Sequence, residues 1–144
     1  MTTPAISIQL WTVRDELTAD LDGTLAQLSA IGFTNVEAFG FVSRADELAA
    51  AFARHGISSP TGHASLASGT ENPFDSSIAV PTPDEVFTAA QKLGMTTVFD
   101  PFVAPDRWES VDEIRKTAEA LNAAAAIGAG YGISVGYHNH NQEF

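Results

Sequence analysis

Apolar and polar residues alternate in five short segments of the chain, and a stretch with helical spacing lies between each segment and the next. Alternation is typical of a β-strand, because successive side chains point to opposite faces of a sheet. The predicted strands are residues 6–11, 34–39, 57–63, 96–100 and 133–140. The predicted order is therefore strand, helix, strand, helix along the whole chain.

Apolar residues spaced three or four positions apart predict a helix in each interval between these strands. The predicted helices span about residues 20–31, 43–56, 82–94 and 110–130. Thr82 is expected to cap the third helix, with Pro83 at the first helical position and Glu85 at the third. Ser43 and Ser110 are expected to cap the second and fourth helices in the same way.

Single helices between consecutive strands imply a parallel sheet with right-handed crossovers. One predicted face of the strands is rich in polar side chains. These faces carry Ser7, Gln9 and Trp11; Asn35, Glu37 and Phe39; Ser59, Thr61 and His63; Thr96, Val98 and Asp100; and Ser134, His138 and His140. A doubly wound open sheet is apolar on both faces, whereas the inner face of a barrel lines an active site near the carboxyl ends of its strands. We therefore predict an α/β fold of the parallel (β/α) TIM-barrel type.

Composition narrows the class of protein. The chain has 144 residues, enough for one domain, and a formal net charge of −11. An acidic surface repels phosphate backbones and anionic lipid, so nucleic-acid and membrane partners are not expected. The chain has no cysteine, which excludes a disulfide or thiolate site, and no predicted strand is followed by a GxGxxG or Walker-type loop. The N-terminus leads directly into a strand without a basic or long apolar segment, which predicts a cytoplasmic protein.

The last predicted strand ends in a dense group of possible ligands. His138 and His140 lie two residues apart, so they share a face of the strand, and Glu143 follows where a loop is expected to close on the same point. Imidazole and carboxylate groups are common metal ligands. The alternative is a pair of solvated histidines and a solvated loop carboxylate.

Other candidate residues lie at or near the ends of earlier strands. Glu37 is a charge inside a strand, so it is expected to face a partner or the mouth of a pocket. His63 and Asp100 end the third and fourth strands, where a barrel contacts its substrate, although each also suits a structural role. Gln9 offers an amide to a hydroxyl group, and Trp11 offers either a flat surface for a sugar ring or a core side chain. The long loop of residues 64–81 is expected to be a lid or a surface loop.

Three segments carry a resemblance to a known family. They are residues 7–15 (SIQLWTVRD), 30–37 (AIGFTNVE) and 136–144 (GYHNHNQEF). In this order they resemble the sugar phosphate isomerase/epimerase family of xylose isomerase-like TIM barrels, and the third is close to the family's Tyr-His-Asn-His-x-x-Glu-Phe. Members similar to this chain are isomerases, epimerases, dehydratases or lyases of sugars and cyclitols, usually with a divalent metal such as Mn, Mg, Co or Zn.

The resemblance implies a sugar or cyclitol isomerase or epimerase that moves a proton next to a carbonyl, with a divalent metal stabilising the developing oxyanion. The expected catalytic residues are Glu143 and Glu37. The expected substrate contacts are Gln9, Trp11, His63, His138 and Asp100. The expected metal ligands are Glu143, His138 and His140.

The predicted strand count departs from the family. A complete barrel has eight strands, and five are predicted here. We expect a single domain over residues 1–144 that is truncated after the fifth strand, either a fragment of a longer protein or a half-barrel that self-associates through its open edges. The family's later metal ligands have no counterpart, so this chain is expected to be inactive alone and need not bind a metal.

Alternative functions stay open on the sequence. One is a non-catalytic half-barrel that only assembles. Others are a sugar dehydratase or lyase, or a metal-dependent endonuclease-like hydrolase, which the acidic charge of the chain disfavours. The sequence leaves the sugar, the reacting carbon and its phosphorylation undetermined.

Overall fold

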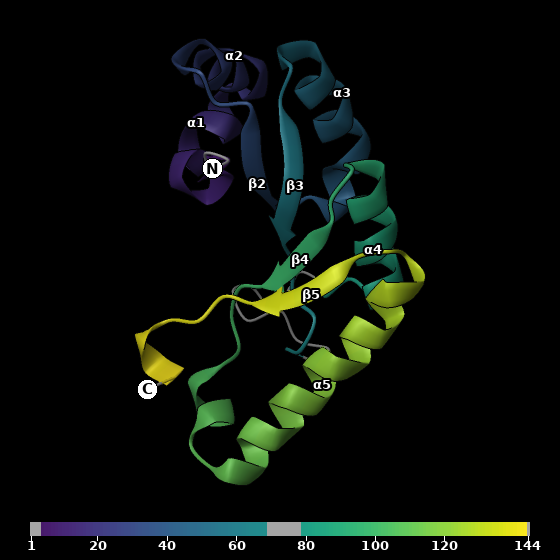
Figure 1. The fold of residues 1–144 in the computed structure, drawn as a ribbon. Helices are drawn as coiled ribbons and strands as arrows, with labels where there is room; N and C mark the ends of the chain where they lie inside the picture. Colours follow the sequence, from purple (N-terminus) through teal and green to yellow (C-terminus); the bar gives the residue numbers. More distant parts are fainter. Residues whose placement is uncertain (1–3, 69–78, 144) are drawn as a thin grey trace.

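The five predicted strands form one parallel sheet in the computed structural model, which describes residues 4–68 and 79–143 (Figure 1). The strands are β1 (Ser7–Gln9), β2 (Asn35–Phe39), β3 (Ser58–His63), β4 (Thr97–Asp100) and β5 (Ser134–Tyr137). They lie in chain order from β1 to β5, and every neighbouring pair is parallel. The predicted α/β fold is confirmed.

Four of the five α-helices in the described residues lie close to their predicted positions. The five are α1 (Arg14–Ala19), α2 (Leu21–Ile31), α3 (Ala45–His55), α4 (Pro83–Lys92) and α5 (Val111–Gly130). Short 3₁₀ segments cover Leu10–Val13, Val42–Arg44, Pro105–Trp108 and Asn141–Glu143. Within the described ranges, no helix combines the length and apolar character that a membrane span requires.

Capping residues explain where two of the helices begin. Thr82 accepts a hydrogen bond from the Glu85 backbone, and the Glu85 side chain accepts one from the Thr82 backbone, so the predicted capping box is confirmed. Ser110 also caps α5 as predicted. The prediction for Ser43 is wrong, because a 3₁₀ turn intervenes and Arg44 precedes α3 without a side-chain cap hydrogen bond.

The core lies between the sheet and its helices. Val36, Ala38 and Val98 are fully buried on one face of the sheet, and they belong to the same apolar cluster as Leu25 of α2 and Phe87 of α4. Figure 1 shows α3, α4 and α5 along one side of the curved sheet. Gln9, Glu37, Thr61 and His63 lie on the other face of the sheet.

Strand register corrects the predicted face of β4. Thr61 of β3 pairs with Thr97, and His63 pairs with Phe99. Paired residues share a face, so Thr97 and Phe99 belong to the polar face, and Asp100 points to the helix-covered side. The sequence prediction started the alternation one residue too early at this strand.

The first and last strands are shorter than predicted. β1 ends at Gln9, so Trp11 lies in a 3₁₀ turn rather than in the strand. The helix α1 that follows was not predicted. β5 ends at Tyr137, so His138 and His140 lie in the segment after the strand.

Candidate functional site

Four polar side chains are joined by hydrogen bonds on the polar face of the sheet, and we call them the Glu37 cluster: Gln9, Glu37, Thr61 and His63. The Thr61 hydroxyl donates to Glu37 Oε2 at 2.7 Å. His63 Nε2 lies 2.9 Å from Glu37 Oε1, and His63 Nδ1 lies 3.1 Å from Gln9 Nε2. The cluster therefore gathers Gln9, Glu37 and His63, three of the predicted site residues.

Strand register explains why these residues meet. Gln9, Glu37 and Thr61 occupy one row across β1, β2 and β3, and His63 lies two residues further along β3. In a parallel sheet the carboxyl ends of the strands lie at the same edge, where α/β enzymes place their ligands. The Glu37 cluster thus occupies the position that the fold favours for chemistry.

Burial sets the electrostatics of this cluster. The His63 side chain is 6% exposed and the Glu37 side chain 18% exposed. Burial lowers the pKa of His63, and the nearby Glu37 carboxylate only partly opposes this effect. His63 is therefore held toward its neutral form.

A row of imidazoles continues from this cluster. The rings of His63 and His138 have centroids 5.1 Å apart, and those of His138 and His140 are 4.9 Å apart. The outer ring, His140, lies 6.3 Å from the Phe102 ring. The two predicted histidines thus lie beside the Glu37 cluster, although both lie outside the strand.

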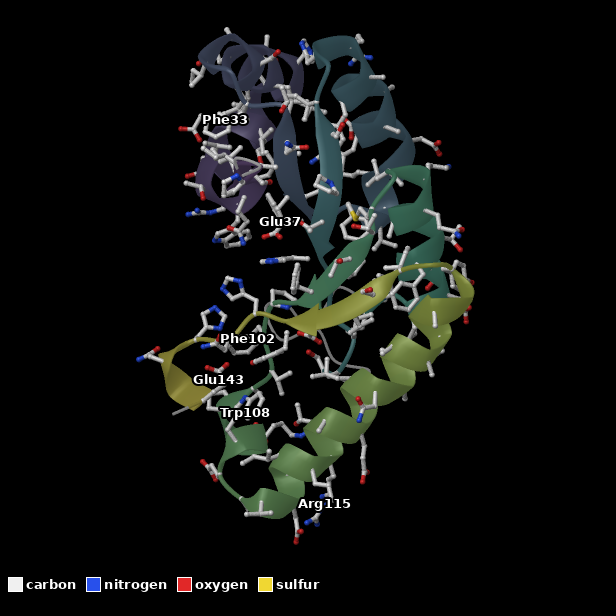
Figure 2. All side chains as sticks on the ribbon, in the orientation of Figure 1. Phe33, Glu37, Phe102, Trp108, Arg115 and Glu143 are labelled. Carbon is white, nitrogen blue, oxygen red and sulfur yellow. The ribbon has the colours of Figure 1, made fainter. Side chains whose placement is uncertain are left out.

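Both carboxylate oxygens of Glu143 accept hydrogen bonds. Tyr137 donates its hydroxyl proton to Glu143 Oε1 at 2.6 Å, and the His140 backbone N–H donates to Oε2 at 2.6 Å. Burial acts to raise the pKa of the Glu143 carboxyl, but these hydrogen bonds outweigh it and the pKa is lowered. Burial and the Glu143 charge raise the pKa of Tyr137, whose ring packs on Trp108. In Figure 2 Glu37 lies by the sheet and Glu143 lies in the C-terminal segment.

The described residues do not arrange His138, His140 and Glu143, the predicted metal ligands, as a site for a metal ion. Within residues 4–68 and 79–143, no three His, Asp or Glu side chains are arranged to hold a metal ion. The carboxylate is turned toward Tyr137 and the His140 backbone, and His140 Nδ1 lies 3.8 Å from Glu143 Oε1. A metal-binding role for these residues stays a prediction, and the described residues do not fit a complete metal site.

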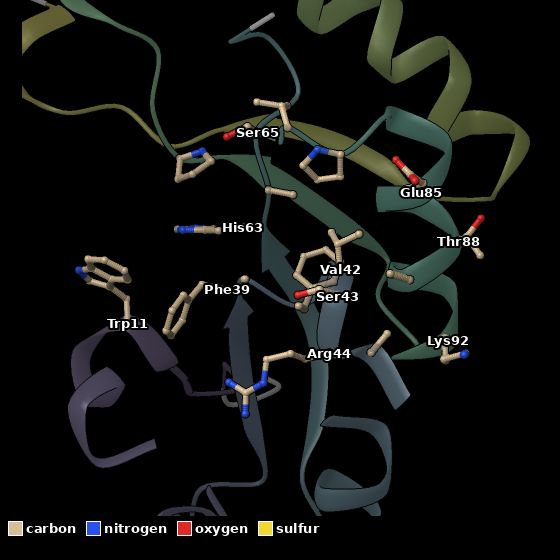
Figure 3. A pocket seen from close by; sticks show the side chains of 18 of the residues that line it. Trp11, Phe39, Val42, Ser43, Arg44, His63, Ser65, Glu85, Thr88 and Lys92 are labelled. Carbon is tan, nitrogen blue, oxygen red and sulfur yellow. The ribbon is translucent and has the colours of Figure 1, made fainter. Parts of the chain in front are cut away.

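A pocket of about 1370 Å³ adjoins the Glu37 cluster (Figure 3). Gln9, Trp11, His63, His138 and His140 all contribute to its lining. A smaller pocket of about 300 Å³ is lined by Glu37, His63, Phe99, Tyr137, His138 and Asn139. Five of the predicted site residues thus line the larger pocket, and Glu37 lines the smaller one with His63 and His138.

Trp11 forms an aromatic wall of the larger pocket. The ring is 50% exposed and meets Phe39 edge to face, with centroids 5.1 Å apart. The Arg14 guanidinium lies 4.8 Å from its centroid, a cation–π distance. Figure 3 shows Trp11, Phe39 and His63 side by side along the pocket.

The predicted lid is only partly described. Residues 69–78 lie outside the described ranges, and of the rest of this loop Ala64, Ser65 and residues 79–81 line the larger pocket. A lid function stays a prediction.

Asp100 is not on the pocket face, where the sequence placed it. Its side chain is fully buried, and its Oδ2 accepts hydrogen bonds from the backbone N–H groups of Leu66 at 2.8 Å and Ala67 at 2.7 Å. Its Oδ1 accepts from Phe102 N–H at 3.0 Å. Burial raises the pKa of Asp100 despite these bonds. The carboxylate ties the loop after β3 to the end of β4.

Two site residues were not predicted. Thr61 holds one oxygen of Glu37, and Tyr137 holds one oxygen of Glu143. The alternation that selected His63 also places Thr61 on the polar face, so the sequence pattern could have identified Thr61. Tyr137 gave no such signal, because it occupies the apolar face and reaches Glu143 through a turn.

Comparisons with known proteins identify the fold. No family model matches the chain, and no curated protein sequence matches it. A solved structure of a sugar phosphate isomerase/epimerase from Parabacteroides distasonis is similar, with 22% identity and a TM-score of 0.76 over 96% of this chain and 53% of that one.

Two further solved structures show the same relationship at lower similarity. The IolI protein with a bound zinc atom is 17% identical, with a TM-score of 0.64 over 93% of this chain and 51% of that one. An AP endonuclease, family 2, from Brucella melitensis is 18% identical, with a TM-score of 0.58 over 81% of this chain and 48% of that one. The chain therefore spans about half the length of these structures and has the fold of part of a xylose isomerase-like TIM barrel.

Proposed function

We propose that this chain forms part of the active site of an isomerase or epimerase that acts on a sugar or cyclitol. The observation that carries the proposal is the Glu37 cluster, a carboxylate oriented by Thr61 and His63 beside a pocket at the carboxyl ends of parallel strands. The fold shared with a sugar phosphate isomerase/epimerase supports the same reaction class. The substrate is a small molecule, and a cytoplasmic location is part of the proposal.

The proposed chemistry is proton transfer next to a carbonyl. The Glu37 carboxylate removes a proton from the carbon beside the carbonyl. The C–H electron pair forms a C=C bond as the carbonyl π electrons move to oxygen, which gives an enolate. Return of the proton to the former carbonyl carbon, together with transfer of the hydroxyl proton to the former carbonyl oxygen, completes an isomerisation. An epimerisation instead requires a proton from an acid on the opposite face of the same carbon. Thr61 and His63 each hold one oxygen of Glu37, which fixes the direction in which its free lone pairs point.

The substrate contacts follow from the pocket lining. Gln9 and His138 present polar groups at the same surface as Trp11, whose ring is half exposed. A flat aromatic surface with polar groups beside it suits a ring that is apolar on its faces and hydroxylated at its edge. Glu143 remains a proposed catalytic carboxylate only if it is released from Tyr137.

A divalent metal belongs to the proposal only for a complete barrel. The IolI structure contains zinc, but the described residues of this chain do not form a site for a metal ion. We therefore assign no step to a metal, and we propose that the chain alone binds substrate without turning it over.

The test is ligand binding by the purified chain. Saturation-transfer NMR against a panel of ketoses, aldoses and keto-cyclitols is expected to show saturable binding by at least one class. Glu37→Gln is expected to weaken this binding at least several-fold, since it removes the charge that faces the smaller pocket. Glu119→Gln, an exposed position on α5, is the matched control and is expected to leave binding unchanged. Absence of binding across the whole panel contradicts the proposal.

Solvent deuterium exchange separates binding from catalysis. Incubation in D2O with a bound sugar is expected to give no exchange at the carbon beside the carbonyl above the buffer rate. Exchange that is lost in Glu37→Gln would show that the chain is active on its own, against the proposed inactivity.

A non-catalytic half-barrel is the second candidate. It is favoured by one observation, that no group of three metal-ligating side chains forms in the described part of the chain. A chain that binds no sugar and assembles in solution would support it. The endonuclease fold shares the architecture, but the net charge of −11 opposes a nucleic-acid substrate.

A further inference from the structure

We infer that Gln9 is a positioning residue that holds His63 as the neutral imidazole with its proton on Nε2, and that His63 donates this proton in a hydrogen bond to Glu37. Gln9 thereby acts on the proposed base, Glu37, through His63 and without a contact to the reacting carbon. The inference rests on the proposed function, in which Glu37 is the base.

The partners of the two ring nitrogens define the tautomer. Gln9 Nε2 is an amide nitrogen that only donates hydrogen bonds, so the facing His63 Nδ1 must keep its lone pair free. Glu37 Oε1 belongs to a carboxylate that only accepts, so the facing His63 Nε2 must carry a proton. One neutral tautomer satisfies both contacts.

The opposite orientation of the Gln9 amide is disfavoured. It would turn the amide oxygen toward His63 Nδ1, and the ring would then need a second proton and a positive charge. The ring is only 6% exposed, and burial opposes the charged form. The neutral ring is therefore the stable arrangement.

His63 and Glu37 therefore have different roles within the Glu37 cluster. Both nitrogens of His63 are engaged, so His63 is not free to take a proton from a substrate. Glu37 keeps lone pairs beyond those used by His63 and Thr61, because each carboxylate oxygen has two. The proton from the substrate therefore goes to Glu37, and Gln9 keeps His63 in the state that orients it.

The tautomer can be measured directly. Long-range ¹H–¹⁵N correlation NMR on protein labelled in histidine distinguishes the protonated ring nitrogen from the unprotonated one, and His63→Gln assigns the signals by loss. The wild-type chain is expected to show His63 protonated on Nε2 alone at neutral pH. Protonation of His63 on Nδ1 in the wild-type chain would by itself overturn the inference.

Two variants at one position test the cause. Gln9→Leu removes the donor and is expected to shift the His63 Nδ1 signal toward a mixture of tautomers. Gln9→Glu offers an acceptor to Nδ1 and is expected to give a doubly protonated ring. Gln27→Leu, an exposed glutamine of α2, is the control and is expected to leave the His63 signals in place.

Unchanged His63 signals in both Gln9 variants would also overturn the inference. The outcome is independent of the sugar-binding test. A wild-type chain with the expected tautomer that binds no sugar would contradict the proposed function and leave the assignment of Gln9 intact.

Discussion

At the scale of single residues, the carboxylates of Glu37 and Asp100 have different roles. Glu37 keeps a partly exposed carboxylate beside a pocket, whereas both oxygens of Asp100 accept bonds from backbone N–H groups. A carboxylate that satisfies buried N–H groups is costly to replace, because those donors then lack a partner. Asp100 is therefore a structural residue that places the loop beside His63.

Replacing Asp100 with Asn tests this role. The amide keeps one oxygen and turns an N–H₂ group toward backbone donors, so we expect the free energy of unfolding to fall by about 1–3 kcal/mol. Urea denaturation of Asp100→Asn measures the change. Asp106→Asn, an exposed aspartate, is the matched control and is expected to stay within about 0.5 kcal/mol of the wild type. Equal stability of the two variants would contradict the role.

The lowered pKa of His63 predicts a dependence of stability on pH. Below the ordinary value of 6.5 the unfolded chain binds the proton first, so His63 stabilises the fold fully above that pH. This contribution is lost as the pH falls toward the lower native pKa. Urea denaturation at a series of pH values in this range gives the free energy of unfolding as a function of pH. The slope of that function is expected to be smaller in His63→Phe than in the wild type. A slope in His63→Phe as steep as in the wild type would refute the prediction.

Sequence spacing selected Gln9, Glu37 and His63 as separate candidates, and the structure joins them by hydrogen bonds. Glu37 was identified because it is a charge within a strand, β2. His63 was identified because it is an imidazole at the end of β3, on the same face of the sheet. The structural role of Asp100 was only an alternative on the sequence, because two of its partners are backbone atoms on a loop about 33 residues earlier in the chain. The partners of Glu143 depend on a turn that sequence spacing does not specify.

At the scale of elements, the order of strands and helices was predictable and the turns were not. Strand order and direction follow from single helices between strands, since crossovers are right-handed and short. The 3₁₀ turn at Leu10–Val13 and α1 interrupt the alternation after β1, and no periodic signal marks them. The face of β4 was misjudged for a related reason, because a strand of four residues is too short to reveal its own register.

The contact between α5 and β5 depends on a glycine. A Cβ atom at Gly128 would lie 2.8 Å from the Ile133 carbonyl oxygen and 3.0 Å from the Phe87 ring. We expect Gly128→Ala to lower the free energy of unfolding by about 1–3 kcal/mol, because a backbone oxygen must move. This loss exceeds the gain in helix propensity of about 1 kcal/mol.

Gly130→Ala is the matched control for this contact. A Cβ atom there meets nothing within 4 Å, so the variant is expected to be neutral or slightly stabilised in the same thermal and urea denaturation measurements. Stabilisation of Gly128→Ala would show that α5 is not closely packed at this position.

At the scale of the whole molecule, β1 and β5 are the edges of the described sheet. Each has one neighbouring strand, and Ile6, just before β1, is 72% exposed. Unpaired strand edges with apolar side chains favour pairing with another chain. We therefore expect the chain to self-associate through these edges.

Light scattering coupled to size exclusion measures this association. Ile6→Lys is expected to shift the mass toward the monomer, because a charge at the edge opposes strand pairing. Ile31→Lys, at the end of α2 and equally exposed at 72%, is the matched control and is expected to keep the wild-type mass. A monodisperse wild-type monomer would contradict the prediction.

The chain order of the strands also bears on how the protein is made. Each new strand pairs with the one synthesised just before it, so every step of sheet assembly closes only the connection between two consecutive strands. Short loop closures are fast, and a nascent chain folds from its N-terminus as it leaves the ribosome. This sheet can therefore grow strand by strand during synthesis, with Gln9, Glu37 and His63 already linked before β4 is translated.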